Sequence, residues 1–224
     1  LASVTDAAGG VHSYGYDAAG NMLRDSYSRV KSDGTTANEA ILYTRDVLGR
    51  VTAQAIATDN GTSWVRGDSQ NSEYNAYGEV SRRGLNDLWQ ENLSYDNAGR
   101  VVKSNGGDGV WRFFVYDANG NKTLTVESEG TDLAALSLSQ ALALAQPGGV
   151  AAGSAFVDGI NVGITTYDKR NMALSTILPQ RELAAGAARV SITTSQSYNA
   201  FGELKSQTDA RGNTVDFTYS SMGR

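Results

Sequence analysis

Acidic side chains are the residues of this chain that could most readily do chemistry, because they recur in a fixed pattern. The pattern is an aromatic residue, then Asp, Asn or Ser, two variable residues and a glycine. Asp17, Asp96 and Asp117 occupy its second position and could in principle bind calcium. Calcium needs several oxygen ligands close together, whereas each copy offers one carboxylate without an Asp-x-Asp companion. We therefore expect no bound metal and no other cofactor.

Catalytic side chains are scarce. His12 is the single histidine and there is no cysteine, so any Ser-His-Asp scheme would have to use a histidine beside a predicted turn. The 24 Asp and Glu residues leave a carboxylate pair for glycoside hydrolysis open as an alternative. Most of the acidic residues that can be placed already belong to predicted turns. We expect no catalytic residues, and no enzyme.

Aromatic residues suggest a second kind of site. Trp64, Trp89 and Trp111, with 11 tyrosines, could stack against sugars. The same residue types also provide cross-strand packing in a thin sheet, and we favour that interpretation. A cell-surface carbohydrate-binding or adhesive module remains the alternative function, with surface glycans as its partners.

Composition excludes several classes of protein. The formal net charge of −5 argues against a nucleic-acid partner, which requires a basic surface. No apolar run reaches membrane-spanning length, and the first residues lack the basic and apolar regions of a signal peptide. Glycine is abundant, with 25 residues, and proline occurs only twice, which is typical of a fold with many tight turns.

The recurring pattern itself is best explained as a β-turn. Asp, Asn and Ser are favoured at the first position of a type I turn, where the side chain accepts hydrogen bonds from later N–H groups. The glycine position suits a residue with positive φ, and Asn171, the one exception, is the non-glycine residue that best tolerates it. The candidate structural residues are Tyr16, Asp17, Gly20, Asp46, Gly49, Tyr74, Asn75, Gly78, Tyr95, Asp96, Gly99, Tyr116, Asp117, Gly120, Tyr167, Asp168, Asn171, Tyr198, Asn199, Gly202, Asp209, Gly212, Tyr219 and Gly223.

The spacing of these turns predicts an array of β-hairpins. Gly78, Gly99 and Gly120 are 21 residues apart, and half-period turns such as Asp209–Gly212 lie between some copies. The segments 110–116, 189–194 and 214–219 are rich in aromatic and β-branched residues or alternate in polarity, as strands do. We predict an all-β, antiparallel fold.

One region interrupts the repeat. Good helix formers predict an inserted helix of about four turns, which begins at Thr131 or Asp132 and ends at Gln146. A Gly/Ala-rich loop is predicted to follow it through Gly153. A second, weaker helix is predicted over 179–185. The chain is thus divided into a hairpin array (1–130), an insertion (131–165) and a second array (166–224).

The motif Tyr-Asp-x-x-Gly-Arg/Asn at this period resembles the YD repeat of the RHS family, as does the pairing of Thr208–Asn213 with a downstream tyrosine. That family includes bacterial RHS polymorphic toxins, the B and C components of insecticidal toxin complexes, wall-associated proteins and teneurins. The resemblance covers nearly the whole chain except the insertion. The copy Arg45–Gly49 lacks the tyrosine, and the copy Tyr167–Asn171 lacks the glycine.

The resemblance implies a spiralling β-sheet that forms part of a hollow shell around a C-terminal toxin domain. It implies a secreted or cell-surface protein whose partners are the enclosed domain and the rest of a long polypeptide. The family's Asp-Pro-x-Gly motif, where the cargo is released, is absent, since neither Pro147 nor Pro179 follows an aspartate. Both ends fall within repeat-like sequence, so we expect this chain to be a wall segment of a longer protein.

Overall fold

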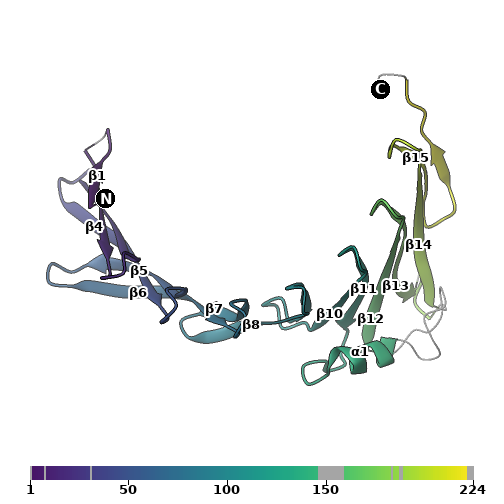
Figure 1. Cartoon of the computed structure of the whole chain (residues 1–224), viewed down its shortest axis with the longest axis horizontal. Coiled ribbons are helices and arrows are strands. Elements are labelled where there is room, and N and C mark those ends of the chain that lie inside the picture. Colours follow the sequence, from purple (N-terminus) through teal and green to yellow (C-terminus); the bar gives the residue numbers. More distant parts are fainter. Residues whose placement is uncertain are drawn as a thin grey trace. The chain divides into compact units, whose positions relative to one another are not determined.

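The fold is built almost entirely of antiparallel strands (Figure 1). The computed structural model describes residues 2–7, 9–30, 32–145, 159–182, 184–186 and 189–220. It contains sixteen strands and one short helix, and the strands follow one another in chain order. The predicted all-β, antiparallel fold class with one inserted helix is confirmed.

The chain divides into two compact units, Leu1–Leu93 and Ser94–Arg224. The strands that begin in the first unit are β1 (Ser3–Thr5), β2 (Val11–Tyr16), β3 (Met22–Val30), β4 (Thr36–Arg45), β5 (Val51–Asp59), β6 (Trp64–Tyr74), β7 (Val80–Leu85) and β8 (Leu88–Tyr95). The second unit contains β9 (Val101–Ser104), β10 (Arg112–Tyr116), β11 (Lys122–Ser128), α1 (Leu138–Ala145), β12 (Ile160–Tyr167), β13 (Ala173–Glu182), β14 (Arg189–Tyr198), β15 (Leu204–Thr208) and β16 (Thr214–Asp216). The predicted segments 1–130, 131–165 and 166–224 follow repeat content instead and stay a prediction.

In the first unit, small side chains fill one face of the sheet. Residues two apart on a strand share a face, and β5 accordingly alternates between buried Ala53, Ala55 and Ala57 and exposed Gln54 and Ile56. The pairing register places further buried residues of β4 and β6 on the alanine face, namely Ala40 opposite Ala57, Ser69 opposite Ala55 and Asn71 opposite Ala53. This face therefore combines small apolar and polar groups.

In the second unit, the insertion between β11 and β12 covers a hydrophobic core. Fully buried Phe113 and Val126 on neighbouring strands pack with Leu133 and Ala141 from the insertion. The helix α1 lies against β11 (Figure 1). Burying these side chains is the main stabilising contribution that the insertion can make.

Lys103 fixes the insertion to the sheet. Its ammonium group donates hydrogen bonds to the backbone carbonyls of Ala134 (2.6 Å) and Leu136 (2.9 Å). The same group lies 4.7 Å from the ring centre of Trp111 and 5.1 Å from that of Phe113, which are cation–π distances. Burial lowers the pKa of Lys103. The ammonium therefore provides hydrogen bonds to backbone carbonyls of the irregular insertion.

The inserted helix is shorter than the predicted span from Thr131 or Asp132 to Gln146. It begins at Leu138 because Ser137 caps it: Ser137 N–H donates to Gln140 Oε1 (2.9 Å), and Gln140 N–H donates back to Ser137 Oγ (3.3 Å). This reciprocal pair is a capping box. Upstream, Asp132 accepts the N–H of Ala134 in a separate turn. The predicted loop through Gly153 lies outside the described residues.

The second predicted helix, over 179–185, is wrong. The strand β13 continues through Pro179 to Glu182 and pairs with β14, where Arg181 is opposite Val190. The register shifts between Leu178 and Arg181, at the point where Pro179 has no N–H to donate. Pairing with β14 outweighs the local helix propensity of this segment.

Among the described residues, no helix combines the length and the apolar character needed to cross a membrane.

We expect Leu133→Ala to destabilise the second unit by about 3 kcal/mol, because it leaves a cavity between the insertion and the sheet. Chemical denaturation followed by circular dichroism measures this loss. Leu48→Ala makes the same chemical change at a side chain that is 73% exposed, and should leave stability unchanged. Equal effects of the two substitutions would contradict the assigned core.

Candidate functional site: the row of motif turns

The motif turns lie at one end of the strands within each unit. Successive connections in a hairpin array alternate between the two ends of its strands, and motif turns follow the even-numbered strands. They are residues 17–20, 46–49 and 75–78 in the first unit, and 96–99, 117–120, 168–171 and 199–202 in the second. The insertion and the related turn 209–212 lie at the opposite end (Figure 1).

Each motif turn is organised by one side-chain oxygen. We number the motif from its aromatic residue, so that Asp or Asn is position 2, glycine is position 5 and the next residue is position 6. In the turn at 117–120, Asp117 Oδ1 accepts the N–H groups of Asn119 and Asn121, both at 2.9 Å. The same two bonds recur at Asp17, Asp46, Asn75, Asp96, Asp168, Asn199 and Asp209.

The backbone of these turns is the predicted type I turn followed by a left-handed residue. The N–H of Gly120 donates to Asp117 O at 3.1 Å, and Gly120 has a φ of 89°. Asn171, which replaces the glycine in one copy, has a φ of 65° and the same backbone bond to Asp168. Gly223 lies outside the described residues.

Positions 2 and 6 form complementary pairs. Where position 2 is Asp, position 6 donates to its second oxygen, as Arg50 does to Asp46 at 2.7 Å. The other pairs of this kind are Asn21–Asp17, Arg100–Asp96, Asn121–Asp117 and Asn213–Asp209. Where position 2 is Asn, position 6 is Glu and accepts instead, in Asn75–Glu79 (2.7 Å) and Asn199–Glu203 (2.6 Å). The two positions therefore match in hydrogen-bonding character.

The turn at 168–171 has Met172 at position 6, which cannot pair with Asp168. Here Arg170, at position 4, donates to Asp168 Oδ2 at 3.0 Å. The second carboxylate oxygen is thus satisfied from another position of the same turn, which shows that the pairing and not the residue at position 6 is the constant feature.

These hydrogen bonds hold the turn carboxylates in their charged form. A hydrogen bond from the Arg100 side chain is the largest cause that lowers the pKa of Asp96, and the Asn121 side chain does the same to the pKa of Asp117. Because the pKa is lower in the folded chain, the stabilisation is complete above the ordinary value of 3.8 and is lost as the pH falls through the lowered one. The turns therefore weaken in acid.

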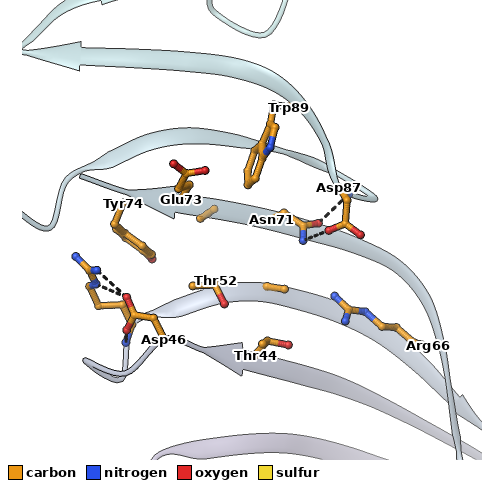
Figure 2. A pocket seen from close by; sticks show the side chains of 12 residues that line it. Thr44, Asp46, Thr52, Arg66, Asn71, Glu73, Tyr74, Asp87 and Trp89 are labelled. Carbon is orange, nitrogen blue, oxygen red and sulfur yellow. Dashed lines mark hydrogen bonds and ion pairs between the residues drawn. The ribbon is translucent and has the colours of Figure 1, made fainter. Parts of the chain in front are cut away.

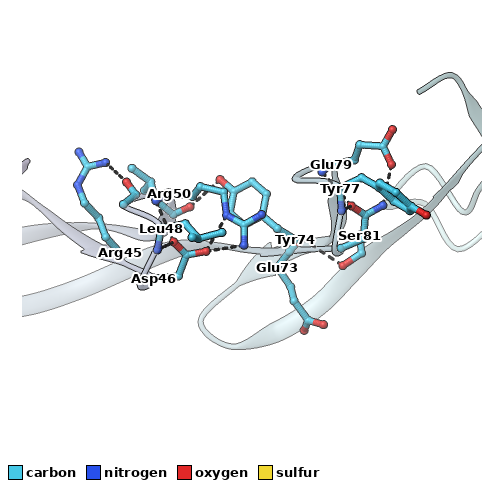
Figure 3. Close-up of polar contacts among 12 residues, drawn as sticks. Arg45, Asp46, Leu48, Arg50, Glu73, Tyr74, Tyr77, Glu79 and Ser81 are labelled. Carbon is cyan, nitrogen blue, oxygen red and sulfur yellow. Dashed lines mark hydrogen bonds and ion pairs between the residues drawn. The ribbon is translucent and has the colours of Figure 1, made fainter. Parts of the chain in front are cut away.

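Several pairs of consecutive motif turns are joined by a hydrogen bond from position 1. The tyrosine hydroxyl donates to the carbonyl of the residue two after the preceding motif's glycine, as Tyr74 does to Val51 O at 2.8 Å (Figure 3). The other bonds of this type are Tyr116 to Val101 (2.8 Å), Tyr167 to Lys122 (3.2 Å) and Tyr219 to Leu204 (2.9 Å). We call these bonds the turn-to-turn links.

Arg45 takes the place of the tyrosine that its copy lacks. Its Nε donates to Met22 O at 3.0 Å, and Met22 is the residue two after Gly20. Its Nη1 also donates to Gly49 O at 2.7 Å within its own turn (Figure 3). The departure from the motif therefore keeps the link. Tyr198 does not make the link, because its hydroxyl donates to Gln196 at 2.8 Å.

Arginines at position 6 strengthen the contact between neighbouring turns. The guanidinium of Arg50 lies 4.6 Å from the ring centre of Tyr74, and that of Arg100 lies 4.8 Å from the ring centre of Tyr116. Arg100 also donates to Asp117 O at 3.1 Å. Each such arginine pairs with its own turn and stacks on the next motif's tyrosine, a favourable cation–π geometry.

The other candidate residues have structural contacts. His12 lies 3.4 Å from Asp25 Oδ1 and packs against Tyr27 at 4.7 Å between ring centres. A cation covers a face of each tryptophan: Arg24 on Trp64, Arg82 on Trp89 and Lys103 on Trp111. In the part of the chain that the structure describes, no group of three or more His, Cys, Asp or Glu side chains could hold a metal ion.

A swap of the pair at positions 2 and 6 tests their complementarity. Asn75→Asp places a carboxylate against Glu79 and should destabilise the first unit, whereas adding Glu79→Arg recreates the Asp–Arg pair of the turns at 46–49 and 96–99. We expect a coupling free energy of about 1 kcal/mol in thermal or chemical unfolding. Additive effects of the two substitutions would show that these side chains do not interact.

Comparison with known proteins agrees with the motif. Residues 198–224 match the family model described as RHS Repeat. No curated protein matches the chain. Solved structures that resemble it include the Photorhabdus luminescens Tc holotoxin pore (14% identity, TM-score 0.31, covering 97% of this chain and 13% of that one) and the complex TcdB2-TccC3 (14%, 0.31, 97% and 14%). The complex TcdB2-TccC3-Cdc42 is similar at 13% identity and TM-score 0.28, covering 98% of this chain and 14% of that one.

The chain spans 13–14% of the length of these solved chains. The matched residues contain the motif turn at 199–202 and the related turn at 209–212, and the same turn geometry recurs at Asp17, Asp46 and Asn75 in the first unit and at Asp96, Asp117 and Asp168 in the second. The family model thus identifies an RHS repeat at residues 198–224, and the same turn geometry recurs along the described chain.

Proposed function

We propose that this chain is a structural wall segment of a larger RHS/YD-repeat protein, and that the wall encloses or presents a C-terminal toxin or effector domain for delivery. The observation that carries the proposal is the row of turn-to-turn links. A wall needs resistance to local opening along its length, and these links connect several neighbouring hairpins beyond the hydrogen bonds of the strands themselves.

The links act where a sheet of hairpins is weakest. A single two-stranded hairpin is marginally stable in water, and strand ends fray first. Tyr116 reaches from the end of β10 to the carbonyl of Val101 at the start of β9, so it holds the end of one hairpin to its neighbour. Arg100 adds a second contact between the same turns through Asp117 O. Opening one hairpin therefore requires breaking contacts with another.

The motif's polar groups are used within the wall, which supports a structural role over a catalytic one. Both oxygens of Asp96 and Asp117 accept hydrogen bonds from their own turns. A catalytic carboxylate instead needs an oxygen available to substrate. By the same reasoning, we propose that the repeat region is not an enzyme.

The RHS resemblance supports the remaining parts of the proposal. The partners are the rest of a long polypeptide and an enclosed toxin domain, and the assembled protein is secreted or displayed at the cell surface. We also propose that the wall is curved, spiral and hollow, as the RHS resemblance implies. Net negative charge is consistent with a client other than nucleic acid.

Removing two links tests the wall. In the full-length polypeptide, the double variant Tyr74→Phe/Tyr116→Phe removes two hydroxyl groups. The backbone carbonyls of Val51 and Val101 then lose these hydrogen bonds. Each bond contributes about 1 kcal/mol, so we expect protease cleavage of the wall and of the enclosed domain to accelerate by about fivefold per bond.

Tyr77→Phe is the matched control, because the Tyr77 side chain is 91% exposed at a turn tip and should leave cleavage unchanged. Equal cleavage of all variants would show that the links do not hold the wall. A C-terminal domain that is cleaved as fast in the native protein as in isolation would contradict enclosure.

A further inference from the structure

Polar side chains of this chain are commonly held in one orientation by a partner. A groove on the alanine face of the first unit illustrates this (Figure 2). It is lined by Trp89 and Asn71 among others, and Asn71 Nδ2 donates to Asp87 Oδ1 at 2.8 Å. Asn119 differs, because its side chain is exposed at the tip of the motif turn 117–120 and has no hydrogen bond in the part of the chain that the structure describes. Its amide is therefore free to rotate.

Asn119 directly precedes Gly120, and an Asn-Gly pair has a chemistry of its own. Once the glycine nitrogen has lost its proton, it can attack the side-chain carbon Cγ of the asparagine. A bond from nitrogen to Cγ forms, the bond from Cγ to Nδ2 breaks, and ammonia leaves with a proton. Water then opens the cyclic imide at either carbonyl, which gives aspartate or isoaspartate. Glycine permits the attack because it has no Cβ in the way.

The turn at 117–120 differs from the other motif turns in having asparagine at position 4. The residues at this position in the other turns are Ala19, Leu48, Tyr77, Ala98, Arg170 and Phe201. The reaction is therefore possible at one turn of the row. Elsewhere the chain contains two further Asn-Gly pairs, Asn60–Gly61 and Asn105–Gly106, which serve as comparisons within the same molecule.

The first comparison pair is restrained by hydrogen bonds. Asn60 Oδ1 accepts three of them, from Thr62 N–H (3.0 Å), Thr62 Oγ1 (2.9 Å) and Ser63 N–H (2.8 Å). Rotation of this amide toward Gly61 would break these bonds. Gly61 N–H also donates to the carboxylate of Asp59 at 2.9 Å, and a negative charge opposes loss of the proton.

The second comparison pair is restrained by burial. Asn105 is only 8% exposed, and Gly106 N–H donates to Ser104 Oγ at 2.9 Å. Close packing limits rotation of the Asn105 amide, and water has little access to an imide formed there. Both steps of the reaction are thus hindered at this position.

Gly120 N–H has the most favourable surroundings of the three. It donates to the backbone carbonyl of Asp117 at 3.1 Å, a neutral acceptor. Arg100 Nη1 donates to the same carbonyl at 3.1 Å, so a positive charge lies beside this N–H group. A nearby cation favours the deprotonated form of an acid. The turn therefore leaves the amide of Asn119 free and brings a cation to the nitrogen that must lose its proton.

We propose that Asn119 is a deamidation site, and that its conversion to isoaspartate opens the motif turn 117–120. In isoaspartate the backbone runs through Cβ and Cγ, so the turn gains one backbone atom. Asp117 Oδ1 accepts the N–H groups of Asn119 and Asn121, which lie on either side of the added atom. One oxygen cannot hold both in the lengthened turn. The proposal is independent of the wall function, because the chemistry requires only this turn.

Opening this turn affects both of its neighbours in the row. Arg100 from the preceding turn donates to Asp117 O, and Tyr167 from the following motif donates to Lys122 O at 3.2 Å, two residues after Gly120. Both acceptors belong to the backbone that the reaction distorts. A single spontaneous reaction therefore weakens two connections between motif turns, at a rate that depends on time and pH.

Incubation of the chain at mildly alkaline pH, followed by peptide mapping with mass spectrometry, tests the site. We expect Asn119 to be converted at least about tenfold faster than Asn60, because three hydrogen bonds must break before Asn60 can react. Asn105 should also react more slowly than Asn119. In urea these differences should disappear, because all three pairs have the same sequence. The proposal fails if Asn119 stays intact as long as Asn60 and Asn105, or if its advantage persists unchanged in urea.

Two variants separate the added charge from the added backbone atom. Asn119→Asp carries the charge on a normal backbone, and Asn119→Ala cannot form the imide and reproduces the residue at position 4 of the turns with Ala19 and Ala98. Both should keep slow hydrogen–deuterium exchange of the Asn121 amide, whereas the isoaspartate form should lose it. Retained protection of Asn121 in the isoaspartate form would overturn the proposed opening of the turn.

Discussion

In every motif turn that the structure describes from Asp17 to Asp209, one side-chain oxygen accepts two backbone N–H groups, and the rest of the structure depends on this interaction. The bond pair fixes a type I turn and leaves the next residue in the left-handed region, where glycine or asparagine is needed. The resulting bulge shifts the register next to position 1, as it does between Val115 and Tyr116. With the register set in this way, the aromatic residue at position 1 lies where it can contact the preceding motif turn.

The side chains that link the turns therefore follow from the turn itself. Tyr74 and Tyr116 donate to equivalent carbonyls because each of them lies directly after an equivalent β-bulge. Arg45 reaches the same carbonyl position with a different functional group. In the linked turns, position 1 provides a hydrogen-bond donor, which is usually a tyrosine hydroxyl. A long side chain with a terminal donor can make the link, although the Tyr198 hydroxyl donates to Gln196 instead.

Features that depend on local geometry could be predicted from the sequence, and those that depend on distant partners could not. The turns at Asp17 or Asp117, and the exceptional Asn171, follow from residue preferences within five positions. The turn-to-turn links join residues such as Arg45 and Met22, which are 23 positions apart, and no local rule identifies the acceptor. The pairing of Asp with Arg or Asn, and of Asn with Glu, is also local, because positions 2 and 6 are four residues apart. It was not among the sequence-based predictions.

The insertion shows the same division. The Ser137–Gln140 capping box was present in the sequence and marks the start of α1, but the Leu/Ala composition upstream suggested a longer helix. The strand at Pro179–Glu182 could not be predicted, because its partner β14 decides its conformation. The groove lined by Trp89 and Asn71 likewise depends on which strands become neighbours.

Hydrogen–deuterium exchange resolved to single amides tests the central interaction most directly. At Asp96, Oδ1 accepts the N–H groups of Ala98 and Arg100 at 2.9 and 3.0 Å. These two turn amides should exchange slowly in the unmodified chain and rapidly in Asp96→Ala, while the amides of Phe113 and Val126 keep their protection. Rapid exchange of Ala98 and Arg100 in the unmodified chain would contradict the account.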